Sequence, residues 1–219
     1  MRLIEDLAAV YRDHQDPGKA AAMRAYMRDQ FDFFGIASPV RRKLDKPFRD
    51  AADPLRLAQE CWARPEREFQ YFACDLLTRH AKRLEDPLPV LRTLITTKPW
   101  WDTVDALAAN VVGPVVREDQ TPMDAWIEDP DLWVARTAIL HQLRYRAATD
   151  PARLFSYSSR WKHEQDFFIR KAIGWALREY AKTDPEAVRD FVTTHPDLSG
   201  LSKREALKNI GRGDEPPSA

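Results

Sequence analysis

The fold is decided by one short stretch, Asp53-Pro54-Leu55-Arg56-Leu57-Ala58-Gln59-Glu60-Cys61-Trp62. Aspartate is a strong helix N-cap, because its carboxylate accepts hydrogen bonds from the free N–H groups of the first turn. Proline suits the first helical position, since its φ is already helical and its missing N–H would have had no partner there. The apolar residues that follow recur at helical spacing, so the stretch predicts an amphipathic helix beginning at Pro54.

The same dipeptide recurs along the chain, and most copies precede an apolar pattern at helical spacing. Successive copies are separated by 37, 33, 43, 21 and 34 residues. Four of these gaps are close to the ~40 residues of a helix-pair repeat of the HEAT or armadillo kind. The six copies are Asp16-Pro17, Asp53-Pro54, Asp86-Pro87, Asp129-Pro130, Asp150-Pro151 and Asp184-Pro185.

Between these starts there is room for a second helix, and apolar periodicity predicts such helices over residues 67–83, 132–144 and 167–182. No convincing run of alternating β-branched residues predicts a strand. The sequence therefore predicts an all-α chain of roughly eleven to thirteen helices, stacked as antiparallel pairs in a HEAT-like solenoid whose concave face binds the partner. We expect a single domain over residues 1–211 and a flexible tail over residues 212–219.

Composition narrows the class of protein. The formal net charge is zero, but residues 136–212 hold 15 Lys and Arg against 9 Asp and Glu, which is compatible with a local phosphate-binding face. No segment has the length of apolar sequence that a membrane span needs, and the acidic N-terminus does not resemble a signal peptide. Cys61 and Cys74 have no metal-type spacing and are expected to be buried free thiols, which fits a cytoplasmic protein.

Three segments stand out chemically. The first is Trp100-Trp101-Asp102-Thr103-Val104-Asp105. Trp101 and Asp105 are four residues apart, so a helix places an indole and a carboxylate on one face, where they can stabilise a developing positive charge. The alternative is a capping box with Asp102 as N-cap. Residue chemistry alone leaves these two interpretations equally supported.

The second segment places Arg136 inside a nearly apolar helix, where a charge is costly unless it is paired or faces a groove. In the third segment, residues 168–182, Gly174 indicates close approach of a helix or a ligand. Trp175, Arg178 and Lys182 share one helix face there, a composition typical of a nucleic-acid surface. The alternatives are an exposed arginine or a structural ion pair for Arg136, and a core tryptophan with cations at its rim for the third segment.

Together these segments resemble the AlkD-like DNA alkylation repair family, which are bacterial DNA glycosylases built from HEAT-like helical repeats. The match covers about residues 20–210. Further stretches fit the same pattern: Tyr26-Met27-Arg28-Asp29-Gln30-Phe31, Phe34-Gly35-Ile36, Pro39-Val40-Arg41-Arg42, Pro65-Glu66-Arg67-Glu68-Phe69-Gln70-Tyr71 and Leu201-Ser202-Lys203-Arg204-Glu205-Ala206-Leu207.

The resemblance implies excision of cationic N3- or N7-alkylated purines from duplex DNA by hydrolysis of the N-glycosidic bond. It implies a catalytic role for Asp105, with Trp101 and Trp175 against the deoxyribose of the lesion. It also implies DNA-binding roles for Arg136, Arg178 and Lys182. No metal or cofactor is implied, and we expect a monomer. The alternatives are a non-catalytic HEAT-like module that binds structured or damaged DNA, and a scaffold that binds only proteins.

Overall fold

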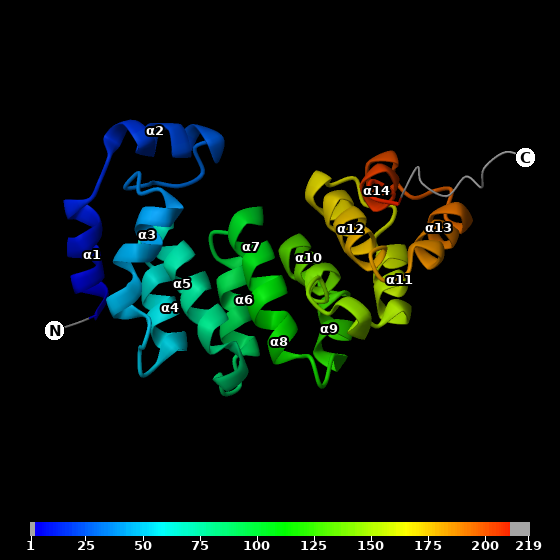
Figure 1. Ribbon diagram of the computed structural model, residues 1–219, viewed down its shortest axis with the longest axis horizontal. Coiled ribbons are helices and arrows are strands. Elements are labelled where there is room, and N and C mark those ends of the chain that lie inside the picture. The colour runs from blue at the N-terminus through cyan, green and yellow to red at the C-terminus, as the bar shows by residue number, and fades with distance from the viewer. Residues whose placement is uncertain (1–2, 211–219) are drawn as a thin grey trace, which may run out of the picture. The chain divides into compact units, whose positions relative to one another are not determined.

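A computed structural model describes residues 3–210 of the chain. These residues form two compact units, one ending at Pro99 and the other beginning at Trp100, and both consist of helices joined by turns and loops (Figure 1). Within residues 3–210 there is no β-strand, and β pairing is limited to one parallel bridge between Asp32 and Glu66. The all-α helical-repeat prediction is confirmed. The expected tail, residues 212–219, lies outside the described residues, and the single domain and the concave groove stay predictions.

Most of the helices follow one another with short connections. None of them, within residues 3–210, combines the length and the apolar character that crossing a bilayer requires. The first unit holds α1 (Leu3–Asp13), α2 (Pro17–Tyr26), α3 (Ser38–Leu44), α4 (Pro54–Trp62), α5 (Arg67–His80) and α6 (Leu88–Thr96). The second holds α7 (Trp101–Leu107), α8 (Gly113–Val115), α9 (Thr121–Trp126), α10 (Leu132–Leu140), α11 (Pro151–Arg160), α12 (Phe167–Tyr180), α13 (Pro185–Thr194) and α14 (Gly200–Ala206). A π-helical turn, Ala108–Val112, joins α7 to α8.

Four of the Asp-Pro dipeptides begin helices as the sequence predicts. In each, proline is the first helical residue and the aspartate side chain accepts a hydrogen bond from the backbone N–H three residues on. These bonds measure 2.9–3.1 Å, the normal range for N–H···O contacts. The four capping residues are Asp16, Asp53, Asp150 and Asp184.

The other two dipeptides do not cap a helix. Asp86 has a φ of 39°, and α6 begins one residue after the proline, at Leu88, without a side-chain cap. Before α10 the cap is Asp131, which accepts hydrogen bonds from the first two N–H groups beyond Leu132. Asp129 instead accepts from the backbone N–H of Asp131, so it shapes the turn that delivers the cap.

The first unit is organised around Glu68 of α5, which is buried. Its carboxylate accepts hydrogen bonds from the backbone N–H groups of Phe34, Gly35 and Ile36, at 2.9–3.1 Å. Gly35 has a φ of +87°, and a Cβ there would lie 2.1 Å from the carbonyl oxygen of Asp16, so glycine is required. The buried charge is therefore compensated by the loop that it anchors to α5.

Helix α10 is the centre of the second unit, and it packs against α7, α9, α11 and α12. Every residue from Val134 to Leu140 is buried. Its C-terminal end fits closely over Gly113 of α8, where an added Cβ would lie 2.3 Å from the carbonyl oxygen of His141. The helix is thus fixed on all sides, so side chains that project from it are held at defined positions.

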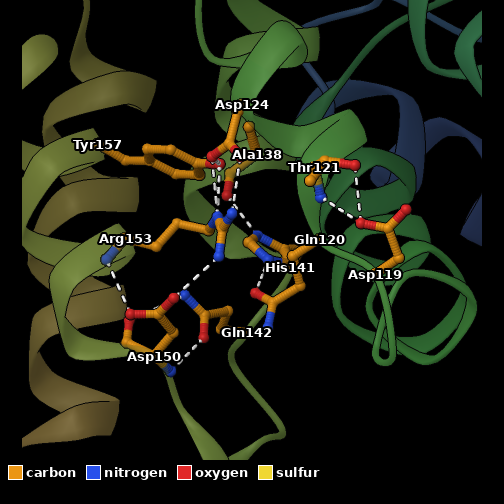
Figure 2. Close-up of polar contacts among 10 residues, drawn as sticks. All are labelled: Asp119, Gln120, Thr121, Asp124, Ala138, His141, Gln142, Asp150, Arg153 and Tyr157. Atoms are coloured by element: carbon orange, nitrogen blue, oxygen red, sulfur yellow. Dashed lines mark hydrogen bonds and ion pairs between the residues drawn. The ribbon is translucent and has the colours of Figure 1, made fainter.

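Figure 2 shows a polar network that closes this end of α10. The buried ring of His141 contacts the Ala138 carbonyl oxygen at 2.6 Å and the Gln120 side-chain oxygen at 2.8 Å. Beside it, Arg153 donates two hydrogen bonds to Asp124, at 2.7 and 2.8 Å. Burial lowers the pKa of His141 to about 4, so the ring is neutral at neutral pH.

Candidate functional site

The site begins on α7, which carries Trp101 and Asp105 one turn apart. The prediction that Asp102 is the N-cap is wrong. Helix α7 begins two residues earlier than the capping box requires, so Trp100 holds the cap position with an extended backbone and no side-chain cap. Asp102 lies inside the first turn, where its negative charge interacts favourably with the positive end of the helix dipole. The capping alternative therefore does not account for Asp105.

Asp105 is held by Arg136, which reaches it from α10. The guanidinium donates from Nε to Oδ1 and from Nη2 to Oδ2, both at 2.7 Å, which is the bidentate geometry of a strong charged pair. Its third nitrogen, Nη1, donates to the carbonyl oxygen of Phe168. The Arg136 side chain is 1% exposed and that of Asp105 is 18% exposed. The carboxylate thus has a fixed orientation but still meets solvent.

Two opposing effects act on the Asp105 carboxyl. Burial raises its pKa above the usual value, because the charged form loses hydration. The Arg136 guanidinium acts in the other direction, since it stabilises the carboxylate by charge and by hydrogen bonds. Burial is the larger effect. Burial thus disfavours the ionised form of Asp105, and the buried Arg136 partly restores it.

The ring of Trp175, on α12, lies among three cations. The guanidinium carbon of Arg136 is 5.7 Å from the ring centroid, the ammonium of Lys171 is 5.3 Å away, and the guanidinium carbon of Arg178 is 5.9 Å away. All three distances are within the ~6 Å of a cation–π contact. Because Arg136 also holds Asp105, the carboxylate, the guanidinium and the indole form one connected cluster.

Glu205 on α14 completes this cluster. One carboxylate oxygen accepts from Lys171 at 2.7 Å, and the other accepts from Arg178 at 2.5 Å. The approach of α14 depends on Gly174, since a Cβ there would lie 2.5 Å from the Cβ of Glu205. The close approach that the sequence predicts at this glycine is therefore that of a neighbouring helix.

A half-buried aromatic group adjoins the pair. The ring centroids of Trp100 and Trp133 each lie 5.1 Å from that of Phe168, whose carbonyl oxygen accepts from Arg136. Trp100 thus packs within the protein. Phe168 links the aromatic group to the Asp105–Arg136 pair.

The predicted site residues are brought together to different degrees. Asp105, Arg136, Trp175 and Arg178 form the connected cluster, and Trp101 shares α7 with Asp105. Lys182 lies beyond the end of α12, where it is exposed and pairs with Glu179 at 2.5 Å. Their roles in catalysis and DNA binding stay predictions, including a direct DNA contact by Arg136, whose three nitrogens already donate within the protein.

Sequence reasoning missed two members of the cluster, Lys171 and Glu205. Lys171 precedes Trp175 by four residues, so helical spacing placed it on the same face. Glu205 had no such signal, because its partners lie 34 and 27 residues away and are reached only when α14 packs on α12.

A sequence model of the family described as "DNA alkylation repair enzyme" matches residues 7–210. A solved structure from Enterococcus faecalis, described as a predicted DNA alkylation repair enzyme, is 31% identical to the chain and superposes with a TM-score of 0.83. The match covers 90% of this chain and 97% of that one. No curated protein matches.

Proposed function

The chain belongs to the DNA alkylation repair enzyme family, and from that premise we propose that it is a DNA glycosylase for cationic N3- and N7-alkylated purines in duplex DNA. The observation that carries the proposal is the Asp105 carboxylate, which is partly exposed and held in a bidentate pair by a buried arginine. A carboxylate that is largely buried and fixed in orientation is well placed to stabilise a developing cation.

Cleavage of the glycosidic bond needs little general-acid catalysis. The alkylated purine carries a positive charge, so it leaves as a neutral base when the C1′–N bond breaks and its electron pair moves to the base. Positive charge then develops on the sugar as an oxocarbenium ion. Asp105 stabilises that ion and orients the water that attacks C1′, and the proton released by the water passes to solvent.

The other residues have distinct roles. Trp101 and Trp175 contact the sugar, and their rings add cation–π attraction as charge develops. Arg136 acts through Asp105 and is a positioning residue: it holds the carboxylate ionised and oriented. Arg178 and Lys182 bind phosphates of the duplex. These assignments draw support from the cluster around Trp175 and from the position of Trp101 on the same helix as Asp105.

Base release from methylated duplex DNA tests the proposal. With enzyme in excess over DNA, the wild-type protein is expected to release 7-methylguanine. Asp105→Asn is expected to slow release at least about 100-fold, because the charge opposite the oxocarbenium ion is lost, and to leave duplex binding largely unchanged. Asp190→Asn, which changes an exposed acid outside the site, is the matched control.

The result also separates the alternatives. Duplex binding without base release by the wild-type protein would instead favour a non-catalytic module. Binding that lacks steep salt dependence would favour a scaffold for proteins, because counterion release accompanies every phosphate contact. Wild-type release that persists in Asp105→Asn would remove Asp105 from the mechanism.

A further inference from the structure

Lys171, Arg178 and Glu205 form a small charged cluster at the edge of Trp175. Lys171 and Arg178 lie four residues before and three after the tryptophan, so α12 places both on its face. Glu205 reaches them from α14 and gives each cation one of its carboxylate oxygens. The cluster therefore carries two positive charges and one negative charge.

The cations keep hydrogen-bonding capacity. An ammonium has three N–H donors and a guanidinium has five, and the bonds to Glu205 involve the Lys171 ammonium and Nη1 of Arg178. Both side chains are about a quarter exposed, at 23% and 25%, whereas Glu205 is 15% exposed. The carboxylate is the more buried partner, and the spare donors belong to the groups that meet solvent.

The carboxylate is itself rigidly placed. Ser202, on the preceding turn of α14, donates from its hydroxyl to the carbonyl oxygen of Arg170 on α12, at 2.8 Å. Gly174 lets the two helices meet without a side chain between them. Lys171 is the main cause of a lowered pKa at Glu205, so the group is ionised at neutral pH. A fixed anion of this kind restricts two long cations that otherwise sample many rotamers.

Two exposed ion pairs on the same unit lack this arrangement. Lys182 pairs with Glu179, and Arg189 pairs with Glu186, each one cation to one carboxylate within a single helix or turn. Such pairs carry no net charge and are weakly held at the surface. The cluster at Trp175 instead has an excess positive charge, bridges two helices, and connects through the indole to Arg136 and Asp105.

From this geometry we propose that Lys171 joins Arg178 in a subsite for one backbone phosphate of DNA, with Glu205 as the residue that positions both cations. The inference rests on the proposed function, because it takes the ligand to be the DNA whose sugar lies at Trp175 and Asp105. The phosphate binds the spare N–H donors of the two cations and holds the backbone beside the indole.

Binding to an undamaged duplex tests the subsite without requiring base release. The dissociation constant is measured by fluorescence anisotropy over a series of NaCl concentrations. Lys171→Gln and Arg178→Gln are each expected to reduce the slope of log Kd against log NaCl concentration by about one. Glu186→Gln, in an exposed pair on α13, is the control and is expected to keep the wild-type slope.

Two variants of Glu205 separate positioning from simple charge. Glu205→Asp keeps the charge but shortens the reach, and Glu205→Gln keeps the reach but removes the charge. Positioning predicts that both weaken duplex binding about tenfold, by loss of charged hydrogen bonds, and that both lower the salt slope. In a Lys171→Gln/Arg178→Gln background, Glu205→Gln is expected to add nothing further. Circular dichroism establishes that each variant is folded.

Other results overturn the proposal. Tighter binding by Glu205→Gln at an unchanged slope means that the carboxylate only repels the phosphate. Unchanged slopes in Lys171→Gln and Arg178→Gln mean that no phosphate binds there, and those two variants decide the matter if Glu205→Gln does not fold. If the wild-type protein releases no base but Lys171→Gln and Arg178→Gln show the expected slope changes, only the glycosylase proposal is contradicted.

Discussion

Arg136 donates two parallel hydrogen bonds to the carboxylate of Asp105, one to each oxygen and both 2.7 Å long. The two residues come from different helices, α10 and α7, so the pair ties the central helix of the unit to the helix that presents the acid. A carboxylate has about four lone-pair positions, and this pair uses two of them. The orientation of Asp105 is thus set by a buried guanidinium, and its remaining lone pairs stay available to a substrate.

The first prediction concerns the geometry of this pair. Arg136→Lys keeps the positive charge but cannot form the bidentate fork. We expect base release under single-turnover conditions to slow about tenfold or more, the effect of losing a hydrogen bond between charged groups. Unchanged release in a folded Arg136→Lys protein would show that the charge of Arg136 suffices and that the fork is not needed.

The second prediction is the pH dependence of base release. The proposed mechanism needs the Asp105 carboxylate, and burial raises the pKa of that group above 3.8. Activity is therefore expected above the raised pKa and is lost as the pH falls through it, so the acid limb lies at higher pH than for an ordinary aspartate. Arg136 lowers this pKa, so Arg136→Gln is expected to move the acid limb to still higher pH.

Rate constants for this test are measured on methylated duplex with spontaneous depurination subtracted, and circular dichroism at each pH shows where the protein unfolds. If the acid limb lies at the same pH in wild type and Arg136→Gln, the rate of base release does not depend on the ionisation of Asp105.

Local patterns in the sequence predicted four of the six helix starts expected at Asp-Pro dipeptides. Asp16, Asp53, Asp150 and Asp184 cap helices as expected, because capping depends only on a residue and the three that follow it. The rule did not hold at Asp86, whose positive φ delays α6. It also did not hold at Asp102, because extended backbone at Trp100 starts α7 two residues early.

The site was predictable only in part, for a related reason. Asp105 and Trp175 could be selected because their helical neighbours and the family resemblance pointed to them. The partner of Asp105 could not be predicted, because the local sequence does not show whether Arg136 faces solvent, a groove or an acid 31 residues away. Glu205 was missed altogether, because its role exists only once α14 has packed at Gly174. Contacts between distant helices are set by packing and leave no local periodicity.

The third prediction links stability to pH through His141. The ring is buried and its pKa is lowered to about 4, against 6.5 in the unfolded chain. Between these values the unfolded state binds a proton that the native state does not, so stability falls as the pH drops from 6.5 toward 4. The full effect is about 3 kcal/mol. Above pH 6.5 the residue adds no pH dependence.

Urea unfolding of wild type and His141→Gln at several pH values measures this effect. The variant loses stability at every pH, because the contacts at both ring nitrogens change. Its loss relative to wild type is nevertheless expected to shrink as the pH falls below 6.5. Buried acids such as Glu68, whose pKa is raised by burial, contribute with the opposite sign, but they are common to both proteins and cancel in the difference. A difference that does not vary with pH would contradict the prediction.

The fourth prediction joins packing to the site through Gly174. Alanine there places a Cβ 2.5 Å from the Cβ of Glu205 and 3.0 Å from the carbonyl oxygen of Ser202, so α14 must move away from α12. Overpacking destabilises by about 1–3 kcal/mol, and the gain in helix propensity returns about 1 kcal/mol. We expect a net loss of stability, and weaker duplex binding with a lower salt slope, because Glu205 moves with α14.

Gly18→Ala is the matched control, since its nearest neighbour, an oxygen of Asp16, lies 3.4 Å away and α2 is otherwise open there. If Gly174→Ala loses stability but keeps the wild-type salt slope, the position of α14 matters to the fold and not to the cations at Trp175.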